Sequence, residues 1–145
     1  MKKIKKSVLF ICADQWRFDC FSFLNHQYAL TPNLDKLAKK SVIFKSHFAG
    51  IVPCGPSRTT MLTGLYPFIH RSVYNGAPLD KRFTNIAKEA RKLNYNPSLY
   101  GYTDTSWDPR YLDPKDEKNF TYESPMEGFD DGCVLPGGKP EPWAN

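Results

Sequence analysis

The sequence is short of cysteine pairs and of long hydrophobic runs, and these shortages exclude several protein classes. None of its four cysteines (Cys12, Cys20, Cys54 and Cys133) forms a C-x-x-C pair. This argues against a zinc site or a thioredoxin-like redox motif. No stretch approaches the ~20 apolar residues of a membrane-spanning helix. The sequence also contains no internal repeats.

A strong charge of one sign is also missing. The formal net charge is +5, and the residues from 2 to 6 hold four lysines (Lys2, Lys3, Lys5 and Lys6). A basic excess can indicate a nucleic-acid or membrane partner. No basic helix face and no basic–aromatic interleaving accompanies this one. We therefore interpret the lysines as a solvated leader and expect neither nucleic acid nor membrane as a partner.

The lysines and the apolar run that follows, Ser7 to Ala13, superficially resemble a secretion signal. A signal needs a longer apolar core and a cleavage site of small residues. The run instead ends at Asp14. We interpret it as a buried strand, expect a cytoplasmic protein, and expect no disulfide framework.

The order of the expected elements predicts an α/β fold. Ser7–Ala13 has the pattern of a central strand covered on both faces. Thr31 suits a helix N-cap and Pro32 the first helical position. The remaining expected elements are a short strand at 42–44, a helix at about 56–62 ended by Gly64, a helix from about 84 to 93, and a strand at 98–102. Strands alternating with helices favour a largely parallel sheet.

Regular structure is expected over about residues 7–110, and a loop-rich part over 111–145, where proline and glycine punctuate the chain. Two strong core strands are few for a stable parallel sheet. The sequence also ends within an apparent loop. We therefore expect residues 1–145 to be the N-terminal portion of a larger protein, truncated as given.

The first group of candidate functional residues follows the first expected strand. Ligands of open α/β sheets bind beyond the carboxyl ends of the strands. Asp14 stands there, and Gln15 could add a neutral oxygen to a divalent metal site. On position alone, a metal ligand and a helix or turn cap are equally good interpretations of Asp14.

The second group is Cys54-Gly55-Pro56-Ser57-Arg58. With Pro56 as the first helical residue, Cys54 would lie just before a helix N-terminus, which favours anions. Arg58 offers a forked donor suited to tetrahedral oxyanions. A thiol phosphatase loop is rejected, because its cysteine and arginine lie further apart and Pro56 removes an N–H group. A buried structural cysteine beside a surface arginine would be the better interpretation of an isolated pair.

The spacing resembles the sulfatase signature, whose cysteine is oxidised to formylglycine by a maturation enzyme. The matching residues are Cys54, Pro56, Ser57, Arg58, Leu62, Thr63 and Gly64. The segments Asp14-Gln15-Trp16-Arg17-x-Asp19, Thr31-Pro32-Asn33-Leu34-Asp35 and Gly64-Leu65-Tyr66-Pro67 also resemble the family's opening, over roughly residues 7–110. The resemblance implies a three-layer α/β sandwich of the alkaline-phosphatase type.

The resemblance also implies a mechanism. The aldehyde made from Cys54 would be hydrated, one hydroxyl would attack sulfur or phosphorus, and the second would allow the covalent ester to collapse. Asp14, Gln15 and Cys54 would be metal ligands, and Arg58 would hold the diol and the ester oxygens. The metal is expected to be calcium, with manganese or magnesium as alternatives. The family's further Asp with His or Asn, and its histidine acid, do not occur in these 145 residues.

One departure from the general pattern indicates a branch of the family. Many sulfatases carry Gly-Lys-Trp-His-x-Gly after the strand at 98–102, whereas this sequence has Gly101-Tyr102-Thr103-Asp104-Thr105. Together with Val52-Pro53-Cys54-Gly55-Pro56, Asn75 and Asp108-Pro109-Arg110, this resembles the phosphonate monoester hydrolase branch. Asn75 and Tyr102 become candidate substrate contacts, with a turn asparagine and a core-edge tyrosine as close alternatives.

The leading functional hypothesis is a formylglycine-dependent, metal-assisted hydrolase of small-molecule sulfate, phosphonate or phosphate monoesters, served by a maturation enzyme. The alternative is a non-catalytic fragment that binds an anion or a partner protein, because the C-terminal metal ligands are missing. His26, His47 and His70 are interpreted as structural, with His70 the best placed of them to lie near the pocket. The sequence leaves open the ester preference, the alcohol part of the substrate and assembly into a homo-oligomer.

Overall fold

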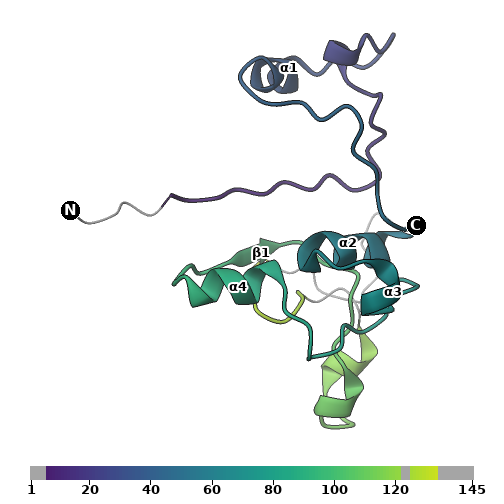
Figure 1. Cartoon of the computed structure of the whole chain (residues 1–145), viewed down its shortest axis with the longest axis vertical. Coiled ribbons are helices and arrows are strands. Elements are labelled where there is room, and N and C mark those ends of the chain that lie inside the picture. Colours follow the sequence, from purple (N-terminus) through teal and green to yellow (C-terminus); the bar gives the residue numbers. More distant parts are fainter. Residues whose placement is uncertain (1–5, 122–124, 134–145) are drawn as a thin grey trace, which may run out of the picture. The chain divides into compact units, whose positions relative to one another are not determined.

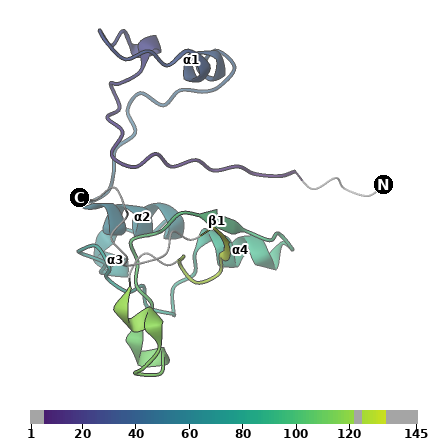
Figure 2. The same cartoon turned by 180° about the vertical axis from the view of Figure 1, so that it is seen from behind.

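The computed structural model describes residues 6–121 and 125–133. It divides the chain into two compact units, Met1–His47 and Phe48–Asn145 (Figures 1 and 2). The expected lysine leader lies almost wholly outside the described residues, as do 122–124 and 134–145 of the expected loop-rich part. Among the described residues, no helix is long and apolar enough to cross a membrane.

The first unit holds two short helices joined through one carboxylate. The 3-10 helix η1 spans Ser22–Leu24 and the α-helix α1 spans Pro32–Ala38. As predicted, Pro32 occupies the first turn of α1 and Thr31 the N-cap. The Thr31 hydroxyl donates to the Asp35 carboxylate (3.0 Å), and the Ser22 hydroxyl donates to the same carboxylate (2.8 and 2.9 Å). Asp35 therefore links η1 to the start of α1.

The two strands predicted in the first unit are not formed. Residues 7–13 and 42–44 carry no strand assignment, and Val8, Leu9 and Ile11 are 78–84% exposed. Apolar patterning identifies residues that would be buried in a sheet, but a strand also needs a ladder partner for its N–H and C=O groups. In the part of the chain that the structure describes, the sheet has two strands and both come from the second unit. The prediction of these two strands is wrong for this structure.

The described part of the second unit is built around three α-helices. They are α2 (Cys54–Thr63), α3 (Pro67–His70) and α4 (Ile86–Lys92), and α2 contacts both of the others. Gly64 ends α2 in the left-handed conformation (φ 69°), where glycine carries no steric penalty, and its N–H donates to the Thr60 carbonyl (2.8 Å). The predicted end of α2 is confirmed, whereas α3 was not predicted.

Helix α4 is capped as its sequence favours and is fastened to a distant segment. The Asn85 side chain accepts hydrogen bonds from the N–H groups of Ala87 and Lys88 (both 3.0 Å). Its amide nitrogen donates to the Glu127 carbonyl (2.8 Å). Further along the helix, Arg91 pairs with Asp130 (2.6 Å). These bonds hold residues 127–130 beside α4 and so place the strand that follows.

Strands β1 (Ser98–Tyr100) and β2 (Asp130–Cys133) pair in parallel, with Ser98 opposite Asp130. Strand β2 and the 3-10 helices η2 (Pro109–Tyr111) and η3 (Glu117–Phe120) fall largely in the part predicted as loop. The prediction missed β2 because Asp and Gly disfavour strands. The Tyr100 ring lies over Gly132, where a Cβ would come within 2.7–2.9 Å of it, so a side chain at 132 would displace this exposed ring. The α/β class with a parallel sheet is confirmed.

The interior of the second unit is unusually polar. Among the described residues, the buried polar or charged side chains, which include Asn85, Thr59, Thr103 and Ser72, outnumber the buried apolar ones, which are Ala77, Ala87 and Met126. Buried polar groups are tolerated only when hydrogen-bonded. The arrangement of the loops after α2 and β1 is therefore fixed by hydrogen bonds more than by apolar packing.

Candidate active site

Cys54 lies at the N-terminus of α2, in the first turn. The helix begins at Cys54 with Pro53 as N-cap, so it starts two residues earlier than predicted and includes the cysteine. The Ser57 N–H donates to the Pro53 carbonyl (3.1 Å) and closes the first turn. Pro56 fits there because an N–H in the first turn has no partner within the helix. Cys54 is a free, half-buried cysteine.

Asn75 holds the residue next to Cys54. Its Oδ1 accepts a hydrogen bond from the Gly55 N–H (2.8 Å). Helix N-termini leave such N–H groups unpaired, so a side chain from another loop here serves as a cap. The bond fixes the position of the α2 N-terminus relative to the loop at residue 75.

Gly55 is required where α2 meets two loops. A Cβ on Gly55 would lie 2.6 Å from the Asp104 carbonyl oxygen and 3.1 Å from the Asn75 Cα. Both are backbone atoms that cannot turn away. The Gly76 N–H donates to the same Asp104 carbonyl (2.8 Å). The loops at 75–76 and 104 therefore meet directly beside the cysteine.

Arg58 is buried and held on two sides. Its Nη1 donates to Asp104 Oδ2 in an ion pair whose side chains are 12% and 7% exposed. The guanidinium also lies over the Tyr102 ring, 4.7 Å from the ring centroid. Such cation–π contacts are stronger when the cation is removed from water. Arg58 is thus held by two neighbours, Asp104 and Tyr102, that lie more than 40 residues further along the chain.

Asp104 is the residue of this cluster that the sequence analysis did not single out. It follows β1 in a left-handed conformation (φ 55°), which Asp and Asn tolerate better than most side chains. It is 6% exposed, between Thr103 and Thr105, which are also buried. In the sequence, the feature that could have identified Asp104 was its position after a strand, in a short polar run. Its partner Arg58 lies 46 residues away and could not be assigned from local spacing.

Asp14 and Gln15 lie in the first unit, in an exposed turn, with Gln15 at φ 53°. The structure brings together the four candidate residues of the second unit: Cys54, Arg58, Asn75 and Tyr102. Among the described residues, no group of three or more His, Cys, Asp and Glu side chains is placed to hold a metal. The assignment of Asp14 and Gln15 as ligands stays a prediction.

The ligands predicted for the metal, Asp14, Gln15 and Cys54, match the preferences of a hard divalent cation only in part. A carboxylate and an amide oxygen are ligands that calcium and magnesium prefer. A thiolate is a soft ligand that favours zinc or copper. Asp14 and Gln15 therefore suit calcium, magnesium or manganese, whereas Cys54 suits them only if its sulfur is replaced by oxygen.

His70 is a buried, neutral hydrogen-bonding residue at the end of α3. The Ser72 N–H donates to its Nδ1 (3.0 Å), so the ring proton lies on Nε2, which donates to Thr60 Oγ1 (2.9 Å). Burial lowers the pKa of His70, because the charged imidazolium would lose its hydration. These contacts join α3 to α2 and agree with the structural role predicted for this histidine.

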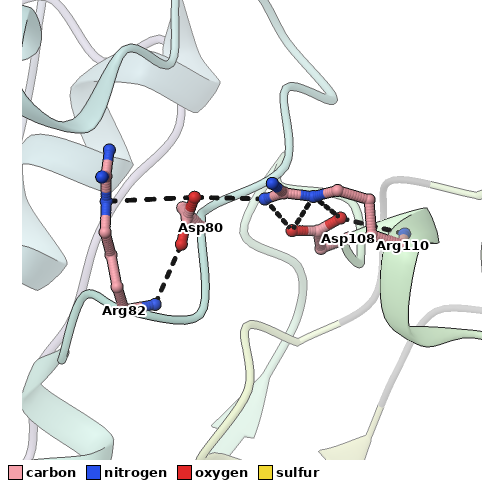
Figure 3. Close-up of polar contacts among 4 residues, drawn as sticks. All are labelled: Asp80, Arg82, Asp108 and Arg110. Carbon is pink, nitrogen blue, oxygen red and sulfur yellow. Dashed lines mark hydrogen bonds and ion pairs between the residues drawn. The ribbon is translucent and has the colours of Figure 1, made fainter.

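Asp108 and Arg110 form a second ion-pair cluster with Asp80 and Arg82 (Figure 3). Arg110 Nε and Nη2 both donate to the buried Asp108 carboxylate (2.5–3.1 Å), and Nη2 also reaches Asp80 Oδ2 (3.1 Å). The bonds from Arg110 hold the pKa of Asp108 below its usual range. The backbone N–H of Arg82, followed by Arg110, does the same for the pKa of Asp80. This cluster ties two loops together.

Comparison with known proteins gives consistent results. The sequence model of the sulfatase family matches residues 6–134. The chain is 42% identical over 130 residues to the multifunctional alkaline phosphatase superfamily protein PehA of Trinickia caryophylli, covering 86% of this chain and 25% of PehA. The chain therefore spans about a quarter of the length of PehA.

Two solved structures resemble the chain closely. The phosphonate monoester hydrolase of Agrobacterium radiobacter is 51% identical with a TM-score of 0.81, covering 86% of this chain and 25% of that one. The phosphonate monoester hydrolase SpPMH of Silicibacter pomeroyi is 48% identical with a TM-score of 0.82, covering 88% of this chain and 25% of that one. The resemblance to this branch, inferred from residues 75 and 101–110, is confirmed.

We predict that Gly55→Ala destabilises the full-length protein that contains this chain. The added Cβ would meet the Asp104 carbonyl at 2.6 Å, so α2 or the 104 loop must shift. Overpacking of this kind costs about 1–3 kcal/mol. Thermal unfolding measures the loss. Gly50→Ala is the matched control, because its Cβ would make an ordinary 3.4 Å contact with Thr60. An equal midpoint for both variants would contradict the predicted close approach.

We predict that His70 makes stability fall as the pH drops through 6.5, its unfolded-state value. The unfolded chain takes up a proton there that the buried native ring does not, so acid favours unfolding. His70→Gln should have a flatter dependence of the thermal midpoint between pH 7.5 and 5.5 than the parent protein. His47→Gln, which removes an exposed imidazole, is the control. A steeper or unchanged slope in His70→Gln would count against the assignment.

Proposed function

Because the chain belongs to the sulfatase family, we propose that it supplies part of the active site of a hydrolase of sulfate or phosphonate monoesters. One observation carries the proposal: Arg58 and Cys54 share the first turns of α2, and Arg58 is held in one orientation by Asp104 and Tyr102. A fixed guanidinium beside a helix N-terminus suits a tetrahedral oxyanion. The spacing of Cys54 and Arg58 is also that of the family signature.

Within this proposal, Cys54 is the precursor of formylglycine and Arg58 binds the substrate oxygens. Converted Cys54 would supply a hydroxyl nucleophile in place of a thiol. The N-terminal end of α2 carries the positive end of the helix dipole, so it stabilises negative charge at residue 54. Arg58 would orient the anion through its guanidinium N–H groups. A maturation enzyme is the implied partner.

Asn75 and Tyr102 are proposed as substrate contacts and as supports. The Oδ1 of Asn75 already accepts from Gly55, so its amide Nδ2 is the end suited to donate to a substrate oxygen. The Tyr102 ring lies against the Arg58 guanidinium, and its hydroxyl is the group that would contact the substrate. Asn75 therefore lies next to the proposed nucleophile, and Tyr102 lies next to the proposed anion-binding residue.

The branch is proposed to be that of the phosphonate monoester hydrolases. The two solved structures at 51% and 48% identity are both phosphonate monoester hydrolases. Phosphonate and sulfate monoesters both present a singly charged tetrahedral group, so the same Arg58 suits either. A cytoplasmic location and a homo-oligomeric assembly stay expectations from the sequence.

Asp14, Gln15 and converted Cys54 are proposed to hold one divalent cation, with calcium as the first choice and manganese or magnesium as alternatives. All three would offer oxygen, the ligand atom these cations prefer. When bound, the cation would supply positive charge for the anionic group of the ester. The chain's own contribution would be the carboxylate charge of Asp14.

We predict that Cys54 is converted to an aldehyde in the full-length protein expressed with a formylglycine-generating enzyme. Peptide mass spectrometry of the Cys54 peptide should show the loss of sulfur and the gain of oxygen. The converted protein should hydrolyse a phenyl phosphonate ester faster than an aryl sulfate. Cys54→Ala should abolish both activities while leaving the thermal midpoint close to that of the parent protein.

Two results would contradict different parts of this proposal. A thiol that stays unmodified, under conditions that convert a control sulfatase, would favour the alternative of a non-catalytic fragment that binds an anion or a partner. Conversion with a strong preference for the aryl sulfate would keep the hydrolase and reject the phosphonate branch.

We predict that the full-length, converted protein binds one divalent cation and that Asp14→Asn weakens it at least ~10-fold, since ligand charge sets affinity in oxygen-liganded sites. Elemental analysis after dialysis identifies the cation, and titration into chelator-treated protein measures its affinity. Asp19→Asn, a nearby carboxylate paired with Arg17 (2.5 Å), is the control. Equal cation affinity in Asp14→Asn and the parent protein would remove Asp14 from the site.

A further inference from the structure

The proposed anion-binding arginine carries its own carboxylate partner. Asp104 Oδ2 accepts from Arg58 Nη1, and the two side chains are only 7% and 12% exposed. An exposed ion pair is screened by water, but a buried one acts at a low effective dielectric. Any anion that binds Arg58 therefore also experiences the negative charge of Asp104.

The backbone of Asp104 is held in place beside the start of α2. Asp104 sits at φ 55°, and its carbonyl oxygen accepts from the Gly76 N–H (2.8 Å) and lies against Gly55. On the other side, the Tyr102 ring lies against the guanidinium. The Asp104 backbone is therefore anchored at the α2 N-terminus, and its carboxylate is held by burial and by the ion pair with Arg58. It is a permanent part of the electrostatic environment at Arg58.

The consequence depends on the charge of the ligand. Attraction to Arg58 and repulsion from Asp104 both grow in proportion to the ligand's charge. A lone arginine would favour a doubly charged anion over a singly charged one. The Arg58–Asp104 pair is close to neutral, so it removes most of that preference while keeping the directed N–H donors that recognise tetrahedral oxygens.

We propose that Asp104 determines substrate specificity by making the Arg58 site selective for singly charged tetrahedral esters. Sulfate monoesters, phosphonate monoesters and phosphate diesters belong to this class. Phosphate monoesters, which carry nearly two charges above pH 7, are disfavoured. The inference rests on the proposed function of Arg58 and adds the charge class of the substrate. Asp104 is a positioning residue, since it acts through Arg58.

The test compares two esters with the same leaving group in the converted, metal-loaded full-length protein. The probes are 4-nitrophenyl phenylphosphonate, with one charge, and 4-nitrophenyl phosphate, with two charges at pH 8. Asp104→Asn keeps the shape of the side chain and tolerates a positive φ. It should raise kcat/KM for the phosphate relative to the phosphonate by at least ~10-fold, because one nearby negative charge is removed.

A purely structural role for Asp104 predicts a different pattern. Loss of packing or of Arg58 order would lower kcat/KM for both esters alike and leave their ratio unchanged. Asp104→Gly, which also accepts the positive φ, provides a second variant if Asp104→Asn folds poorly. Asp80→Asn is the matched control, because it removes a carboxylate from another arginine pair of the same unit. Its ratio should equal that of the parent protein.

A measurement on the parent protein alone gives an independent check. Methyl sulfate, with one charge, should inhibit at a lower concentration than inorganic sulfate, with two. The reverse order, or an unchanged ester ratio in both Asp104 variants of an active protein, would overturn the inference and leave the hydrolase intact. A parent protein that hydrolyses neither ester would overturn the proposed function, and the inference with it.

Discussion

The contact between Asp104 and the start of α2 is the constraint on which the second unit depends. The Asp104 carboxylate pairs with Arg58. The Asp104 carbonyl oxygen accepts a hydrogen bond from the Gly76 N–H and leaves no room for a side chain at Gly55. Three segments distant in sequence therefore meet at one residue. Removing one member of a buried ion pair leaves the other charge unpaired, at a cost of roughly 3–5 kcal/mol. The geometry beside Cys54 is thus tied to folding.

Other buried polar groups extend this scheme away from Cys54. Asn85 caps α4 and bonds the Glu127 carbonyl, His70 links Thr60 to the Ser72 backbone, and Asp108 binds Arg110. Each satisfies a group that would otherwise be buried without a partner. Hydrogen bonds are directional and apolar contacts are not, so a polar interior specifies loop positions more closely. Loops that carry functional residues benefit from that precision.

The parts of the structure that the sequence predicted are those set by local chemistry. Pro32 begins α1, Gly64 ends α2, and the spacing from Ile86 to Leu93 identified α4. The failures concern pairing at a distance. Residues 7–13 have the composition of a strand without a ladder partner, and β2 is a strand despite its composition because α4 and Pro97 hold it. Cys54 and Arg58 were found through their fixed spacing, and Asp104 was missed because only the fold brings it to Arg58.

In the anion-binding role proposed for it, Arg58 has to meet two requirements that oppose each other. A buried ion pair with Asp104 reduces the positive field available to an anion, so it weakens simple electrostatic attraction. The same pair, with the Tyr102 ring, orders a long side chain before any ligand arrives, which removes much of the entropy cost of binding. For a reaction at a tetrahedral centre, orientation relative to residue 54 contributes more than affinity, since tight binding of the ground state does not increase the rate. A paired arginine is therefore better suited to this position than a free one.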